Sequence, residues 1–180
     1  MSRRRPRDIG TAAETAVVRY LHTAGFPHAE RRTLRGNLDA GDITGTPGIC
    51  WEVKGGQAAR TASDLDVTRW MAELATEVRN ARATVGLLVV QRAGVGSANA
   101  GRWWAYMPAF QLADLIEKPM TVEAERHAFP VRMLLADAVS LLRAAGYGSA
   151  TPSPAGDPFG DDRSLRDRVV TVPLPAEVAS

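Results

Sequence analysis

Apolar residues recur at helical spacing in several parts of the chain, and residues 64–82 show this pattern most clearly. Val67, Trp70 and Leu74 begin a stripe with spacings of three and four, as expected of one buried helix face. Ser63 directly precedes this stretch and is a favourable N-cap residue. Similar patterns predict further helices over 9–24, 108–117 and 131–145.

Shorter apolar runs between these predicted helices indicate strands. Residues 85–91 are almost continuously apolar, which is typical of a strand buried on both faces. Residues 51–54 alternate, so that Glu52 and Lys54 share one face of a strand. Residues 102–107 predict the next strand, paired with 85–91. This mixture of helices and strands predicts an α/β fold with a central mixed β-sheet flanked by helices.

Length and composition fit one globular domain with two appendages. The chain has 180 residues, of which 45% are hydrophobic, and this is ample for a single core. We expect a basic N-terminal arm over 1–8 and a folded domain over 9–148. A flexible tail rich in proline and glycine is expected over 149–180.

Composition also argues against several classes of protein. No run approaches the roughly 18 apolar residues of a membrane span, and the basic N-terminus lacks the apolar core of a signal peptide. A single cysteine, Cys50, excludes an internal disulfide and fits a reducing compartment. We therefore expect no membrane association and a cytoplasmic location, in a bacterium or a phage-infected host.

The most informative stretch is a hairpin that brings two acids and a lysine together. Residues 45–48 are a turn signal, and folding back at this turn places Asp42 alongside Glu52. Carboxylate oxygens are natural ligands of Mg²⁺, for which Mn²⁺ is expected to substitute. Lys54 beside such an ion can orient or deprotonate a water and offset charge on a phosphate. The hairpin therefore predicts metal-dependent phosphodiester hydrolysis.

The lysine at position 54 is informative because this chain rarely uses lysine. Of the 22 basic residues, 20 are arginine, and only Lys54 and Lys118 are lysine. A lysine is a compact charge whose pKa shifts with its surroundings, which an arginine cannot supply. The alternative is an edge-strand lysine that prevents pairing with other chains.

These residues give the chain a resemblance to the PD-(D/E)xK nuclease superfamily. The two half-motifs are Gly41-Asp42-Ile43 and Glu52-Val53-Lys54, and the similarity covers roughly residues 8–117. The order of elements is similar to that of Holliday-junction-resolvase-like members from phages and archaea. One departure is that Gly41 stands where the strict motif has proline. The resemblance implies a restriction-endonuclease-like fold, DNA endonuclease activity on branched DNA, and the carbonyl of Val53 as a further metal ligand.

Glu14 has two competing roles at this stage. Thr11-Ala-Ala-Glu14 matches a capping box at the start of the first predicted helix. The resemblance instead implies that Glu14 is a third acid at the metal. The two roles predict different orientations of the Glu14 side chain.

Arginines just before the hairpin are candidates for DNA contact. An extended segment is predicted over 29–35, and it carries Arg31, Arg32 and Arg35. Clustered arginines suit contact with the phosphate backbone, although a solvated basic face has the same composition.

Two residues that follow predicted strands are further candidates. The resemblance implies a polar residue near the end of the motif strand that holds water or substrate, here Gln57. Arg92 follows the central strand on the side of the motif. The function predicted from all these residues is a metal-dependent endonuclease. The alternatives are a restriction- or repair-type nuclease on duplex or single-stranded DNA, and a non-catalytic DNA-binding protein on a nuclease fold.

Two arguments predict a homodimer. Resolving a four-way junction needs two symmetric cuts, which a two-fold dimer supplies. The helix predicted over 131–145 is apolar on more than one face, so it is either buried on several sides or shared with a second subunit. Trp103 and Trp104 should face opposite sides of their strand, with one in the core and the other exposed or in an interface.

Overall fold

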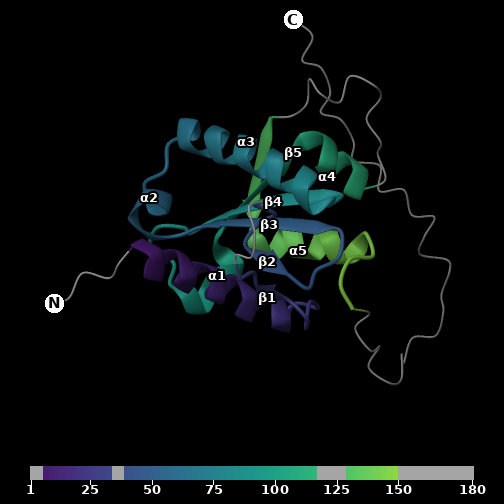
Figure 1. Ribbon diagram of the computed structural model, residues 1–180, viewed down its shortest axis with the longest axis horizontal. Coiled ribbons are helices and arrows are strands. Elements are labelled where there is room, and N and C mark those ends of the chain that lie inside the picture. The colour runs from purple at the N-terminus through teal and green to yellow at the C-terminus, as the bar shows by residue number, and fades with distance from the viewer. Residues whose placement is uncertain (1–5, 34–38, 117–128, 150–180) are drawn as a thin grey trace, which may run out of the picture. The chain divides into compact units, whose positions relative to one another are not determined.

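The computed structural model describes residues 6–33, 39–116 and 129–149. The predictions for the first five residues, for Arg35 and for the tail from residue 150 onward lie outside these ranges. The described residues form an α/β fold with a mixed four-stranded sheet between helices (Figure 1). The predicted α/β class and mixed sheet are therefore confirmed.

The sheet has the strand order β3-β4-β5-β6. β3 and β4 run parallel, and β5 and β6 extend the sheet antiparallel. A separate antiparallel pair, β1 and β2, precedes β3 in the chain. The strands are β1 (Glu30–Arg31), β2 (Ile43–Thr44), β3 (Ile49–Lys54), β4 (Val85–Val90), β5 (Trp104–Pro108) and β6 (Pro130–Leu134). The strand that carries Glu52 and Lys54 therefore lies at one edge of the four-stranded sheet.

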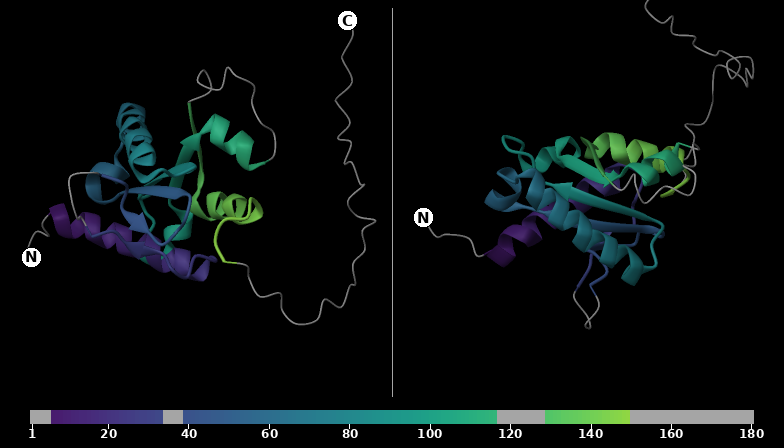
Figure 2. Two further views of the ribbon diagram at one scale, coloured as in Figure 1. Left: turned by 45° about the vertical axis from the view of Figure 1, so that its right-hand side comes forward. Right: turned by 90° about the horizontal axis from the view of Figure 1, so that it is seen from above.

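Helices cover both faces of this sheet (Figures 1 and 2). One face packs against α3, and the other packs against α1 and α5. The helices are α1 (Pro6–Thr23), α2 (Gly56–Arg60), α3 (Asp64–Ala81), α4 (Ala109–Leu115) and α5 (Leu135–Ala144), with a 3₁₀ helix η1 (Ser97–Arg102). Within the described ranges, none of these helices has the length and apolar character needed to cross a membrane.

Alternation along the strands divides the core into two layers. On β4, Leu87 and Val89 face α1 and α5, whereas Leu88 and Val90 face α3. All six residues of β4 are buried, which confirms the prediction of a strand covered on both sides. On β3, Trp51 belongs to the layer that faces α1 and α5. Burial of two layers of Val, Leu and Trp side chains is the main stabilising contribution to such a domain.

The predicted helix over 131–145 is wrong in its first part. Residues 130–134 form strand β6, which pairs with β5, and helix α5 begins only at Leu135. The many apolar residues of the predicted helix therefore belong to two elements, β6 and α5. Val139 and Leu142 of α5 are buried within the core of the same chain. The apolar helix consequently gives no reason to invoke a second subunit.

The tryptophan pair follows the prediction in part. Trp103 is fully buried in the core layer that faces α1 and α5. Trp104 is only partly buried, and the guanidinium groups of Arg92 and Arg132 lie over its ring, with 4.3 and 4.7 Å from the guanidinium carbons to the ring centroid. The exposed side of Trp104 is thus occupied by two arginines of its own chain.

Candidate active site

Asp42 is fixed to the free edge of β3 by backbone hydrogen bonds. Its N–H donates to the carbonyl of Trp51 at 2.7 Å, and its carbonyl accepts from the N–H of Arg32 at 2.7 Å. Its carboxylate Oδ2 accepts the N–H of Val53 at 2.8 Å. The turn that folds this segment back is held by Trp51, whose Nε1 donates to the buried hydroxyl of Thr46 at 2.9 Å. The hairpin therefore places Asp42 beside the Glu52-Val53-Lys54 strand, as the sequence predicted.

The glycine in place of the motif proline has a steric cause. Gly41 has φ +87°, a left-handed conformation that proline, with φ near −65°, cannot adopt. A Cβ atom at this position would lie 2.7 Å from the Trp51 carbonyl oxygen and 2.8 Å from Cys50 Sγ. Close approach of the backbone to β3 thus requires glycine here, and this approach is what seats Asp42.

Glu52 is buried and lies near the partly buried Asp42. Glu52 is 7% exposed, and the two carboxyl groups lie close enough for each to affect the pKa of the other. Burial and then the charge of Glu52 raise the pKa of Asp42 to about 7, although the Val53 N–H lowers it in part. Burial also raises the pKa of Glu52 to about 7, even though Lys54 lowers it. Without a cation, the pair therefore retains protons near neutral pH.

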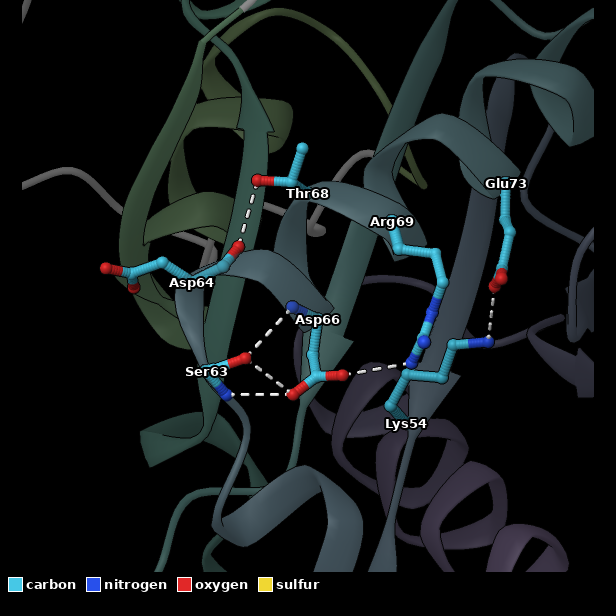
Figure 3. Close-up of polar contacts among 7 residues, drawn as sticks. All are labelled: Lys54, Ser63, Asp64, Asp66, Thr68, Arg69 and Glu73. Atoms are coloured by element: carbon cyan, nitrogen blue, oxygen red, sulfur yellow. Dashed lines mark hydrogen bonds and ion pairs between the residues drawn. The ribbon is translucent and has the colours of Figure 1, made fainter.

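Lys54 links the motif strand to helix α3. Its ammonium contacts the carboxylate of Glu52. Figure 3 shows its second contact, with Oε2 of Glu73 at 3.1 Å. The ammonium also lies 5.8 Å from the ring centroid of Trp70. Burial alone would lower the pKa of Lys54, but the hydrogen bonds to the two glutamates outweigh it, so this pKa is raised. Lys54 is consequently a fixed positive charge at neutral pH.

The start of α3 is anchored by a capping box. Ser63 Oγ accepts the N–H of Asp66 at 3.2 Å, and the Asp66 carboxylate accepts the N–H of Ser63 at 3.0 Å (Figure 3). The predicted cap at Ser63 is confirmed. This cap fixes the first turn of the helix whose third and fourth turns carry Glu73 and Glu77 to the site.

Glu77 is a residue of the site that sequence reasoning missed. It is 5% exposed, and its carboxyl group lies close enough to Glu52 to affect the pKa of that residue. Burial, followed by the charge of Asp39, raises the pKa of Glu77 to about 7. A signal was available, because Glu77 falls between Leu74 and Ala81 at the spacing of the buried stripe.

The capping role predicted for Glu14 is wrong. Helix α1 begins at Pro6, so Thr11 lies inside the helix, and the Thr11 carbonyl accepts from the Thr15 hydroxyl. Proline suits the first turn of a helix because its missing N–H has no intrahelical partner there. Glu14 instead accepts from Nε of Arg31 at 2.8 Å, and it lies close enough to Asp42 to raise the pKa of that residue. Its role at a metal stays a prediction.

The predicted DNA-contact residues have different surroundings. Arg31 is half-exposed and paired with Glu14, whereas Arg32 is partly buried and its Nε has no hydrogen-bond partner within the described ranges. Gln57 is exposed on α2. Arg92 follows β4 and stacks on Trp104. No DNA role is tested by these contacts, and each stays a prediction.

The two strand ends at the motif lie together. The N–H of Gln91, just after β4, donates to the Lys54 carbonyl at 2.9 Å, and its side chain accepts the N–H of Gly56 at 2.8 Å. The predicted placement of the end of β4 on the motif side is therefore confirmed.

The donor set fits a hydrated divalent cation. Across the described ranges, no three histidine, cysteine, aspartate or glutamate side chains are grouped to hold an ion by themselves. Mg²⁺ does not need such a group, because it usually binds one or two carboxylates and keeps several waters. Asp42 and Glu52 supply that pair, and both lie close enough to Glu77, whose Oε2 has no hydrogen-bond partner among the described residues, to affect its pKa.

No protein-family model, curated protein or solved structure matches this chain. The inference of function therefore depends on the residues and geometry of the site itself.

Proposed function

We propose that this chain is a divalent-metal-dependent endonuclease that hydrolyses phosphodiester bonds in DNA. One observation carries the proposal: Asp42 and Glu52 meet at the edge of β3 while Lys54, two residues further along, contacts Glu52. Two like charges held close together in a largely buried site are unfavourable without a cation. A hydrolase for phosphodiesters uses this combination of paired carboxylates and one ammonium.

Each residue has a distinct part in the proposed reaction. Asp42 and Glu52 would hold Mg²⁺, the Val53 carbonyl is proposed as a further ligand, and Glu14 is proposed as a third acid near the metal. The bound metal supplies positive charge that polarises the scissile phosphate and lowers the pKa of a water. Lys54 offsets negative charge that develops on the phosphate and orients the attacking water. Its raised pKa favours these roles over that of a proton acceptor.

The order of elements supports the nuclease assignment. A first helix with a glutamate is followed by the short strand after Asp42, the strand with Glu52 and Lys54, an amphipathic helix and an apolar strand. This is the order that the resemblance to Holliday-junction-resolvase-like nucleases implies. We therefore propose branched DNA as the substrate, with Arg31, Arg32 and Arg35 as phosphate contacts. A homodimer is proposed on the need for two symmetric cuts alone.

The experiment that tests this function compares four DNA substrates in parallel. Four-way junction, flap, duplex and single-stranded DNA are incubated with the purified protein and Mg²⁺, and matched reactions contain EDTA. We expect cleavage only with Mg²⁺ and fastest on the junction. Equal rates on all four substrates would indicate a general nuclease and would contradict the resolvase assignment. Binding without cleavage of any substrate would favour the non-catalytic DNA-binding alternative.

A further inference from the structure

A buried carboxylate on α3 has no role in the reaction described above. Glu77 is 5% exposed, and its Oε2 atom has no hydrogen-bond partner within the described ranges. Buried polar atoms in folded proteins nearly always have a partner, because leaving one without a partner is costly. Glu77 lies on the same face of α3 as the buried apolar residues Val67, Trp70 and Leu74, so the burial of a glutamate there needs a specific cause.

The protein groups around Glu77 do not balance its charge. Its carboxyl group lies near Glu52, and Asp39 and Asp42 add further negative charge. The ammonium of Lys54 acts on Glu77 only from a distance, because it is in contact with Glu52 and Glu73.

The arrangement is held in place from both sides. Asn80, one turn after Glu77 on α3, donates its Nδ2 hydrogen to the Asp39 carbonyl at 2.7 Å. This bond ties the segment that carries Asp42 to the helix that carries Glu77. The free Oε2 atom therefore belongs to an assembled part of the site rather than to a loose side chain.

We propose that Glu77 is a positioning residue of the metal site, whose Oε2 accepts a hydrogen bond from a water of the cation held by Asp42 and Glu52. This inference rests on the proposed function. Contact through a water fits both facts on the site: Mg²⁺ retains waters when it binds proteins, and no three acidic side chains in the described ranges converge on one ion. Residues that orient a metal's ligands in this way typically change its affinity by roughly 10- to 100-fold.

The test is calorimetric titration of Mn²⁺, without DNA, into the full-length protein and its variants. We expect Glu77→Gln, which keeps an acceptor oxygen, to weaken Mn²⁺ binding about tenfold, and Glu77→Leu, which removes it, about 100-fold. Asp64→Asn is the matched control, because Asp64 is an exposed acid on the same helix, and it should bind Mn²⁺ as wild type does. Asp42→Asn should abolish measurable binding.

Thermal denaturation in EDTA separates this role from a purely structural one. Removing the charge of Glu77 relieves repulsion with Asp39 and Asp42, so the metal-free variants should melt at or above the wild-type temperature. Wild-type Mn²⁺ affinity in both Glu77 variants would overturn the role of Glu77 and leave the proposed function standing. Absence of Mn²⁺ binding by wild type would instead overturn the proposed function. If Glu77→Leu does not fold, the Glu77→Gln comparison alone decides.

Discussion

Lys54 connects strand β3 to helix α3 at the candidate site. Its ammonium joins Glu52 on β3 to Glu73 on α3, and these two carboxylates keep it protonated. The sequence left open whether this lysine deprotonates a water or only supplies charge. The contacts favour a fixed charge of compact size, held in one position by two partners.

We predict that Lys54→Arg slows DNA cleavage by roughly 100-fold, the loss typical for one misplaced electrostatic donor. A planar guanidinium keeps the charge but cannot occupy the compact position between the two glutamates. Single-turnover cleavage with Mg²⁺ measures the effect, and circular dichroism checks that the variant is folded. A near-wild-type rate for Lys54→Arg would show that charge alone is sufficient.

Residue-level prediction succeeded where a local rule governs and failed where packing governs. Strand alternation placed Glu52 and Lys54 on one face, and the turn placed Asp42 next to them. The spacing of α3 indicates that Glu77 is buried, but its proximity to Glu52 depends on how α3 packs across β3, which no local pattern encodes. The Glu14 cap was wrong because α1 starts at Pro6, before the residue taken as the cap.

At the scale of elements, residues 130–134 show how tertiary pairing overrides a local pattern. Their apolar residues continue the spacing of α5, and this favoured one long helix. The structure uses them as β6 because β5 offers hydrogen bonds along Trp104–Pro108, a long-range pairing that helical spacing cannot reveal. Helix α3 and strand β4 were predictable because each carries a strong pattern over its whole length.

The cap of α3 gives a prediction at this scale. We expect Ser63→Ala to lower the free energy of unfolding by about 1 kcal/mol, because the N–H of Asp66 loses its acceptor. Thr76→Ala, at an exposed position inside the same helix, should leave stability unchanged or slightly higher. Urea denaturation followed by circular dichroism measures both. Equal stability of Ser63→Ala and wild type would mean that the cap contributes nothing to the fold.

At the scale of the whole molecule, the acidic cluster links stability to pH. Asp42, Glu52 and Glu77 have pKa values of about 7 in the folded protein, above their ordinary values of 3.8 and 4.5. A raised folded-state pKa stabilises the fold at low pH, and this stabilisation is lost as pH rises through the folded-state value. In EDTA, the free energy of unfolding should therefore fall between about pH 4.5 and 7.5, by at least about 2 kcal/mol.

Urea denaturation at several pH values in EDTA measures this dependence. Asp42→Asn should show a flatter profile, because one of the coupled carboxyl groups is absent and the amide oxygen can still accept the Val53 N–H. Adding Mg²⁺ at pH 8 should raise the free energy of unfolding of the wild-type protein, because an ion that binds only the folded protein stabilises it. A wild-type profile that rises across this range would contradict the burial of the three carboxyl groups.

Nicking of supercoiled plasmid DNA by wild type, Asp42→Asn and Asp64→Asn decides whether Asp42 and Glu52 form a metal-dependent nuclease site. We predict that wild type and Asp64→Asn convert the plasmid to nicked and linear forms with Mg²⁺ and not with EDTA. Asp42→Asn should be at least about 100-fold slower, because it lacks one of the two carboxylates that hold the metal. Cleavage that persists in EDTA, or that Asp42→Asn supports at the wild-type rate, would contradict a metal-dependent nuclease site at Asp42 and Glu52.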